Sequence, residues 1–141
     1  MKTNILRPLL MLTLLLAIAG IPACAQSAAS PKREAKKNLV VKEWQTKAGS
    51  KRKVLDHQTS YDGQGRKYEE IEYASYGQKY RIVYEYEGAS TRCSREVEYD
   101  DKNHVVVIRK YEYNDDGTRK RQYNYYPNGK LASTKDFEYT R

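Results

Sequence analysis

The stretch Tyr125-Tyr126-Pro127-Asn128-Gly129-Lys130-Leu131 (YYPNGKL) decides the fold. Its proline, asparagine and glycine, in that order, describe a type I turn followed by a residue in the left-handed conformation. Such turns commonly join two antiparallel strands, and the left-handed residue then forms a small bulge. The stretch therefore predicts a β-hairpin.

The same pattern recurs over most of the chain. A triplet of an apolar residue, a polar residue and tyrosine recurs every 12 to 14 residues, closing on Tyr73, Tyr86, Tyr99, Tyr113, Tyr125 and Tyr139, with Tyr61 heading the series. Four residues after most of these tyrosines comes a residue that tolerates positive φ: Gly65, Gly77, Asn103, Gly117 or Gly129. The step from Tyr86 reaches Ser90 and departs from this pattern, and Gly49, outside the repeat, is expected to be less constrained. A repeat of this period predicts a series of hairpins.

Between the turns, apolar or aromatic residues alternate with charged ones, which is typical of half-buried strands. We expect strands near 38–47, 51–61, 66–73, 78–86, 92–99, 104–113, 118–125 and 130–139. The predicted fold is all-β, an antiparallel up-and-down meander of about eight strands, open and strongly curved. The alternative is a closed eight-stranded barrel. Arg95, Arg109, Arg119 and Arg121 favour the open sheet, because arginines are costly to bury inside a dry barrel.

The N-terminal residues predict export. Lys2 and Arg7 precede an apolar run, and small residues follow at Ala23-Cys24-Ala25, which are the three parts of a signal peptide. We expect residues 1–25 to be this signal, cut between Ala25 and Gln26, and the mature protein to be periplasmic or secreted without a transmembrane span. The alternative is lipidation of Cys24, which would anchor the protein. Residues 26–37 are polar and basic and predict a flexible linker to the tyrosine-repeat domain, residues 38–141.

The mature part carries a net charge of +6, because the signal removes two of the 26 basic residues and none of the 18 acidic ones. All fourteen tyrosines lie in this part. Tyrosine must therefore supply much of the apolar area that aliphatic residues normally provide, with its hydroxyl directed to water or to a partner. This composition favours a thin sheet with a partly wet face.

The stretch Tyr125–Leu131 resembles the hairpin unit of MORN-variant repeats, and Tyr61-Asp62-Gly63-Gln64-Gly65-Arg66 resembles the tyrosine-aspartate (YD) repeats of secreted bacterial proteins, as does the stretch from Tyr113 to Gly117. The whole chain is similar to small exported bacterial proteins of unknown function. The resemblance implies repeat sheets outside the cytoplasm that act as shells, scaffolds or binding surfaces. The chain lacks the second glycine of MORN variants and has a shorter period than YD repeats.

Catalytic and metal-binding patterns are weak. The two histidines, His57 and His104, lie far apart in the sequence and have no metal-ligand spacing, so no cofactor is expected. Asp56 and His57 are neighbours on a strand and should point to opposite faces, which prevents the hydrogen bond of a hydrolase triad. We therefore expect no enzymatic activity.

The remaining candidate is a surface of tyrosine and arginine on the sheet. Aromatic rings stack on sugars, and arginine binds carboxylates, sulfates or phosphates. The expected binding residues are Tyr80, Tyr84, Tyr86, Arg109, Tyr111, Tyr113, Arg119, Arg121, Tyr123 and Tyr125. The alternative is that they form the main packing face. We expect a non-catalytic binding or scaffold module for a glycan or protein partner and, because of export, no nucleic acid. A structural role through strand addition at the sheet edges, including homo-oligomers, is the second hypothesis.

Overall fold

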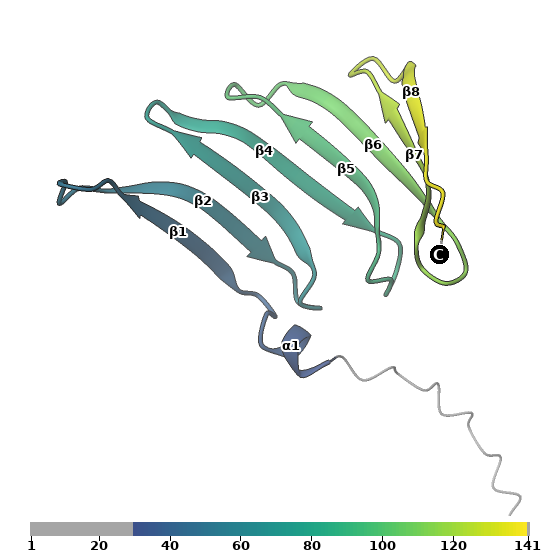
Figure 1. Ribbon diagram of the computed structural model, residues 1–141, viewed down its shortest axis with the longest axis horizontal. Helices are drawn as coiled ribbons and strands as arrows, with labels where there is room; N and C mark the ends of the chain where they lie inside the picture. The colour runs from purple at the N-terminus through teal and green to yellow at the C-terminus, as the bar shows by residue number, and fades with distance from the viewer. Residues whose placement is uncertain (1–29, 141) are drawn as a thin grey trace, which may run out of the picture.

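The structure, a computed structural model, describes residues 30–140. Its elements are α1 (Pro31–Glu34), β1 (Val40–Thr46), β2 (Lys53–Tyr61), β3 (Lys67–Ala74), β4 (Gly77–Tyr86), β5 (Cys93–Tyr99), β6 (Val105–Tyr113), β7 (Arg119–Tyr125) and β8 (Leu131–Asp136). The strands pair in sequence order, each antiparallel to the next, in one eight-stranded sheet (Figure 1). The sheet is open from β1 to β8. The predicted meander is confirmed, and the barrel alternative is wrong.

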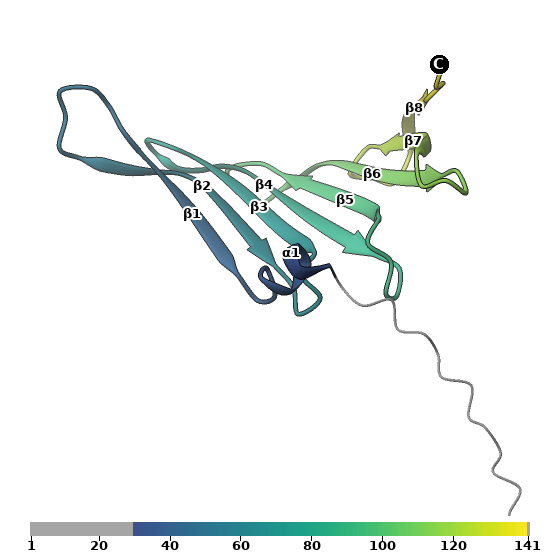
Figure 2. The same cartoon turned by 60° about the horizontal axis from the view of Figure 1, so that its bottom comes forward.

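The sheet is a single layer, which twists from β1 to β8 (Figure 2). Among the described residues, Val97 is the one apolar side chain that is buried, with 3% of its surface exposed. Large apolar residues such as Trp44, at 56% exposed, and Leu131, at 53%, lie at the two edges of the sheet. The fold therefore rests on pairing and contacts along the two sheet faces, without a dry core between two layers.

Every hairpin carries a β-bulge at the same place. The pairing register shifts by one residue at the aromatic residue near the end of the first strand of each pair: Trp44, Tyr61, Tyr73, Tyr86, Tyr99, Tyr113 or Tyr125. A bulge adds one residue to one strand and increases the local right-handed twist. Seven bulges in series account for the strong twist of the sheet.

The turns have the predicted backbone. Gly65, Gly77, Asn103, Gly117 and Gly129 all have positive φ, between 61° and 118°. At the turn that departs from the pattern, Gly88 takes the left-handed conformation with φ 52°. Gly49, outside the repeat, also has positive φ, 79°, and a Cβ there would meet nothing within 4 Å, so a smaller cost of substitution at Gly49 stays a prediction. The β1–β2 turn differs from the repeat turns, because the Ser50 amide donates to the Lys47 carbonyl around Gly49, whereas Gly117 and Gly129 themselves donate the turn hydrogen bond.

The register assigns side chains to two faces. Paired residues in an antiparallel sheet share a face, and successive residues alternate. One face carries Tyr84 with its neighbours Glu96 and Arg109, and we call it the Tyr84 face. The opposite face carries Val97, Ile108 and Tyr125, and we call it the Tyr125 face.

Part of the segment expected to be a flexible linker forms the helical turn α1, which lies beside the β2–β3 turn (Figures 1 and 2). The Asn38 amide donates to the Asp62 carbonyl at 3.1 Å, and Arg33 donates to the Gln64 carbonyl at 3.1 Å. The expected signal peptide, its cleavage after Ala25 and the Cys24 alternative lie outside the described residues. No helix within residues 30–140 has the length and apolar character needed to cross a membrane.

Candidate functional site on two sheet faces

The expected tyrosine and arginine residues divide between the two faces. The Tyr84 face holds Tyr80, Tyr84, Tyr86, Arg109, Tyr111, Tyr113 and Arg119, whereas the Tyr125 face holds Arg121, Tyr123 and Tyr125. Arg119 and Arg121 separate because Tyr113 pairs with Arg119 and its neighbour Glu112 pairs with Arg121. Lys120 is the extra residue of the bulge between them. The residues therefore form two surfaces and not one.

On the Tyr84 face, Glu70 collects three donors. The Tyr84 hydroxyl donates to its carboxylate at 2.8 Å, His57 Nε2 lies 2.9 Å from it, and Lys67 Nζ pairs with it. Lys67 also lies over the Tyr84 ring, 4.5 Å from its centroid. Burial opposes ionisation of Glu70, but the hydrogen bonds from Lys67 and Tyr84 outweigh it and lower the pKa of Glu70. Burial and the same carboxylate raise the pKa of Tyr84, so its hydroxyl stays protonated.

A second acidic cluster holds the arginines of this face. Arg109 Nη2 lies 2.7 Å from Glu98, and its Nη1 lies 3.8 Å from Glu96. Arg119 stacks over the Tyr111 ring at 4.1 Å, and its Nη2 lies 3.9 Å from Glu96. Burial and the Glu96 carboxylate raise the pKa of Tyr111. The Arg109 and Arg119 side chains remain 26% and 41% exposed, yet carboxylates already neutralise them.

Tyrosines of this face also bond to the backbone of the preceding strand. The hydroxyl of Tyr86 donates to the Lys67 carbonyl at 2.6 Å, that of Tyr113 to the Cys93 carbonyl at 2.7 Å, and that of Tyr139 to the Arg119 carbonyl at 2.9 Å. The contacts recur at every second strand, from β4 to β3, from β6 to β5, and from the segment after β8 to β7. These tyrosines therefore stabilise the sheet, in agreement with the alternative that the tyrosine and arginine residues form a packing face.

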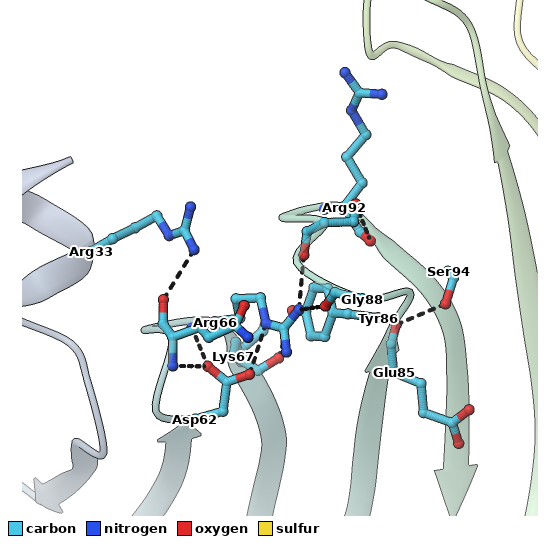
Figure 3. Close-up of polar contacts among 11 residues, drawn as sticks. Arg33, Asp62, Arg66, Lys67, Glu85, Tyr86, Gly88, Arg92 and Ser94 are labelled. Atoms are coloured by element: carbon cyan, nitrogen blue, oxygen red, sulfur yellow. Dashed lines mark hydrogen bonds and ion pairs between the residues drawn. The ribbon is translucent and has the colours of Figure 1, made fainter. Parts of the chain in front are cut away.

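Arg66 joins two neighbouring turns, and Figure 3 shows its contacts. Its Nε pairs with Asp62 at 2.8 Å, and its Nη1 donates to the carbonyls of Gly88 and Ser90 at 2.8 and 3.0 Å. Its guanidinium also stacks over the Tyr86 ring at 4.5 Å. Because its Nε binds one turn and its Nη1 binds the other, Arg66 is a structural bridge.

The Tyr125 face has a different electrostatic character. Arg95 and Lys110 lie directly opposite each other on β5 and β6. Like charges in opposite positions destabilise a sheet. Arg95 is paired with Glu85 on its other side, whereas Lys110 makes no ion pair within residues 30–140 and lies 5.5 Å from the Tyr125 ring centroid.

These two cations border a hollow of about 420 Å³. The residues that line it are Arg95, Ile108, Lys110, Tyr125 and Gly129, and none of them is acidic. The hollow therefore combines an aromatic ring, an aliphatic floor, Lys110, which has no ion pair within residues 30–140, and Arg95, which also pairs with Glu85. Such a set can stack on a ring and bind an anionic group at the same time.

Sequence reasoning missed Arg95 and Lys110 as site residues. The signal that could have found them is the cross-strand register, since it places two cations opposite each other where a carboxylate would stabilise the sheet. That register depends on the bulge after Tyr99, which cannot be located from period-two alternation alone. The first bulge, at Trp44, could not be located from the sequence for the same reason.

Asp56 and His57 are not simple strand neighbours, because Asp56 is the extra residue of the β1–β2 bulge. The carboxylate partner of His57 is Glu70, which already accepts from Lys67 and Tyr84. Cys93 is half-buried, and burial raises the pKa of its thiol to about 11. Within residues 30–140, no three histidine, cysteine or acidic side chains gather as a metal site would require.

No family model matches the chain, and no curated protein sequence matches it. The resemblance to YD and MORN-variant repeats therefore stays a prediction. A solved structure similar to this chain is that of an S. aureus TarM mutant in complex with fondaparinux, alpha-GlcNAc-glycerol and UDP. The sequence identity is 14% and the TM-score 0.30, over 73% of this chain and 20% of the TarM chain. A likeness at this level assigns neither fold nor function.

Proposed function

We propose that this chain is a non-catalytic exported module that binds an anionic glycan or an acidic protein surface outside the cytoplasm. The binding surface is the hollow on the Tyr125 face. The observation that carries the proposal is the pair Arg95 and Lys110, two cations placed opposite each other without a carboxylate in the hollow they border.

The contrast between the faces supports this choice. On the Tyr84 face, the cations form ion pairs with Glu70, Glu96 and Glu98, so an anionic partner would have to displace a carboxylate from its ion pair. On the Tyr125 face, Lys110 meets no acid among the described residues, and its ammonium lies beside Tyr125. A bound carboxylate or sulfate would relieve the repulsion between Lys110 and Arg95, while Tyr125 stacks on the sugar ring.

The test is a binding measurement on the purified protein with heparin and with a neutral glucan as probes. We expect heparin to bind, salt to weaken it, and Lys110→Gln to reduce its affinity several-fold. Arg109→Gln on the Tyr84 face is the matched control and should bind as the unmodified protein does. Equal losses for both variants would show that overall charge, and not the hollow, carries the binding.

A second candidate is a structural role through the sheet edges. Every residue of β1 and every residue of β8 is exposed. Each of these strands has one neighbour, so one side of its backbone is free to pair with an added strand. The two candidates differ in the variants that matter, because edge variants leave the hollow intact.

A further inference from the structure

The free edge of β8 has a defined set of backbone groups. The Phe137 amide donates to the Lys120 carbonyl at 3.1 Å, so it faces β7. Amides alternate in direction along a strand, and those of Thr134 and Asp136 therefore face away from β7. They are the groups that an added strand would use. Before β1, the Leu39 carbonyl accepts from the Tyr61 amide, so the backbone groups of Leu39 face β2. By the same alternation, the amides of Val40 and Lys42 on β1 face away from β2.

The repeat specifies which residues a ninth strand would place opposite β8. The residue before the closing tyrosine is glutamate in β4 and β6, where Glu85 pairs with Arg95 and Glu112 pairs with Arg121. The next member of this series is Glu138, which precedes Tyr139 beyond the end of β8. In residues 30–140, no strand lies on the outer side of Glu138 to provide its cation.

Lys42 holds the corresponding position in β1. On the following strand, Arg95 pairs with Lys110, and Arg121 pairs with Asp136. Each of these partners lies two residues before the glutamate of its own series, Glu112 or Glu138. Lys42 pairs with Gln58, which is two residues before Ser60, the residue that precedes Tyr61. Lys42 is thus the counterpart of Arg95 and Arg121, and it lies on the free edge of the sheet.

We propose that β1 of a second copy of this chain adds to β8 and continues the sheet head to tail. Lys42 of the second copy then lies opposite Glu138, Glu43 opposite Phe137, and Gln45 opposite Lys135. Lys135 and Glu43 become diagonal neighbours on one face, as do Asp136 and Lys42 on the other, so opposite charges meet on both faces. In this register the outward amides of one edge lie opposite residues whose own amides also point outward, so the two strands can exchange hydrogen bonds.

The contact joins two different edges, so it is heterologous and leaves a free β1 and a free β8 at the ends of each assembly. The product is a series of copies and not a closed dimer. This inference names the partner for the edge-assembly candidate and rests on it. It is independent of the hollow on the Tyr125 face, because the paired edges leave Arg95 and Lys110 uncovered.

Sedimentation velocity over a wide range of concentration tests the association. We expect the unmodified protein to form oligomers beyond the dimer as concentration rises. Thr134→Pro removes an outward amide that has no partner within the sheet, and should abolish oligomers while the fold is kept. Thr134→Ala is the matched control and should associate as before. A protein that stays monomeric throughout, or a Thr134→Pro variant that folds and still associates, would overturn the proposal.

Cysteine cross-linking tests the register, in a background that carries Cys24→Ser and Cys93→Ser. Gln45→Cys combined with Lys135→Cys should give disulfide-linked dimers, trimers and higher species, since the two positions are opposite each other across the predicted contact. Gln45→Cys with Ser133→Cys, displaced by two residues, should give far less. Strong dimers from either single cysteine variant would mean two-fold pairing of like edges and would overturn the head-to-tail arrangement. Heparin binding by the same variants reports separately on the hollow.

Discussion

Tyr113 donates a hydrogen bond from its hydroxyl to the backbone carbonyl of Cys93, at 2.7 Å, from the end of β6 to the start of β5. Tyr86 makes the same contact two strands earlier, and Tyr139 makes it two strands later. Val97 is the one buried apolar side chain among residues 30–140, so such hydrogen bonds supply part of the stability that a hydrophobic core would otherwise give.

Removing this hydroxyl should therefore destabilise the protein measurably. We expect Tyr113→Phe to lower the free energy of unfolding by about 1 kcal/mol, the usual net value of such a bond. Urea unfolding followed by circular dichroism gives the value. Tyr126→Phe is the control, because Tyr126 is 55% exposed. If both variants lose the same stability, the contact with the Cys93 carbonyl contributes nothing particular.

Gly65 and Gly129 form a second matched pair. Both have positive φ, 70° and 80°, so alanine is strained at each. A Cβ at Gly65 would lie 2.2 Å from the Arg33 carbonyl oxygen, whereas one at Gly129 meets nothing within 4 Å. We expect Gly65→Ala to push the α1 segment away and to expose Arg33 and Lys36 to trypsin. Gly129→Ala should leave the tryptic pattern of this segment unchanged.

Glu70 should contribute to the acid limb of the stability profile. Its pKa in the folded state is lowered below the ordinary value of 4.5 by its donors, despite burial. The unfolded chain therefore binds the proton more readily, and stability falls as pH drops below about 4.5 through the folded value. Glu70→Gln should flatten this part of the profile, as measured by thermal unfolding between neutral and acidic pH. An acid limb of unchanged slope would contradict the assignment.

Because Arg95 and Lys110 lie opposite each other at the hollow, a substitution that removes one cation should raise stability and lower the affinity for an anionic ligand. Replacing Lys110 with glutamine removes the repulsion with Arg95, and we expect the free energy of unfolding to rise by a few tenths of a kcal/mol at low salt. High salt screens the repulsion and should cancel the gain. Lys120→Gln, at an exposed bulge position, is the control. A loss of stability in Lys110→Gln would mean that its contact with Tyr125 outweighs the repulsion.

The hairpin series was predictable from the sequence because its information is local. A turn such as Tyr126-Pro127-Asn128-Gly129 specifies its own backbone, and the strands on both sides follow from alternation. The predicted strands agree with the observed ones within two or three residues at most ends. The openness of the sheet was predictable from its arginines, since a charge needs either a partner or water.

The division of the site residues between two faces was not predictable in the same way. Alternation assigns Arg119 and Arg121 to one face, but the bulge residue Lys120 lies between them and reverses the assignment. Each bulge changes the count by one, and its position is set by pairing with the neighbouring strand. The ion pairs of Arg109 and the like-charge pair of Arg95 and Lys110 depend on that register and require the structure.

The pairing of each strand with its sequence neighbours alone has a kinetic consequence. Backbone contacts between strands run from β1–β2 to β7–β8, and in the described chain the backbones of strands further apart do not approach each other, although the long Arg119 side chain reaches Glu96 two strands away. Folding of such a chain can nucleate at any hairpin and spread to both sides, as in repeat proteins. Loss of structure should begin at the two ends, where a strand has one neighbour. Amide protons in β4 and β5 would then exchange with solvent most slowly, and those in β1 and β8 first.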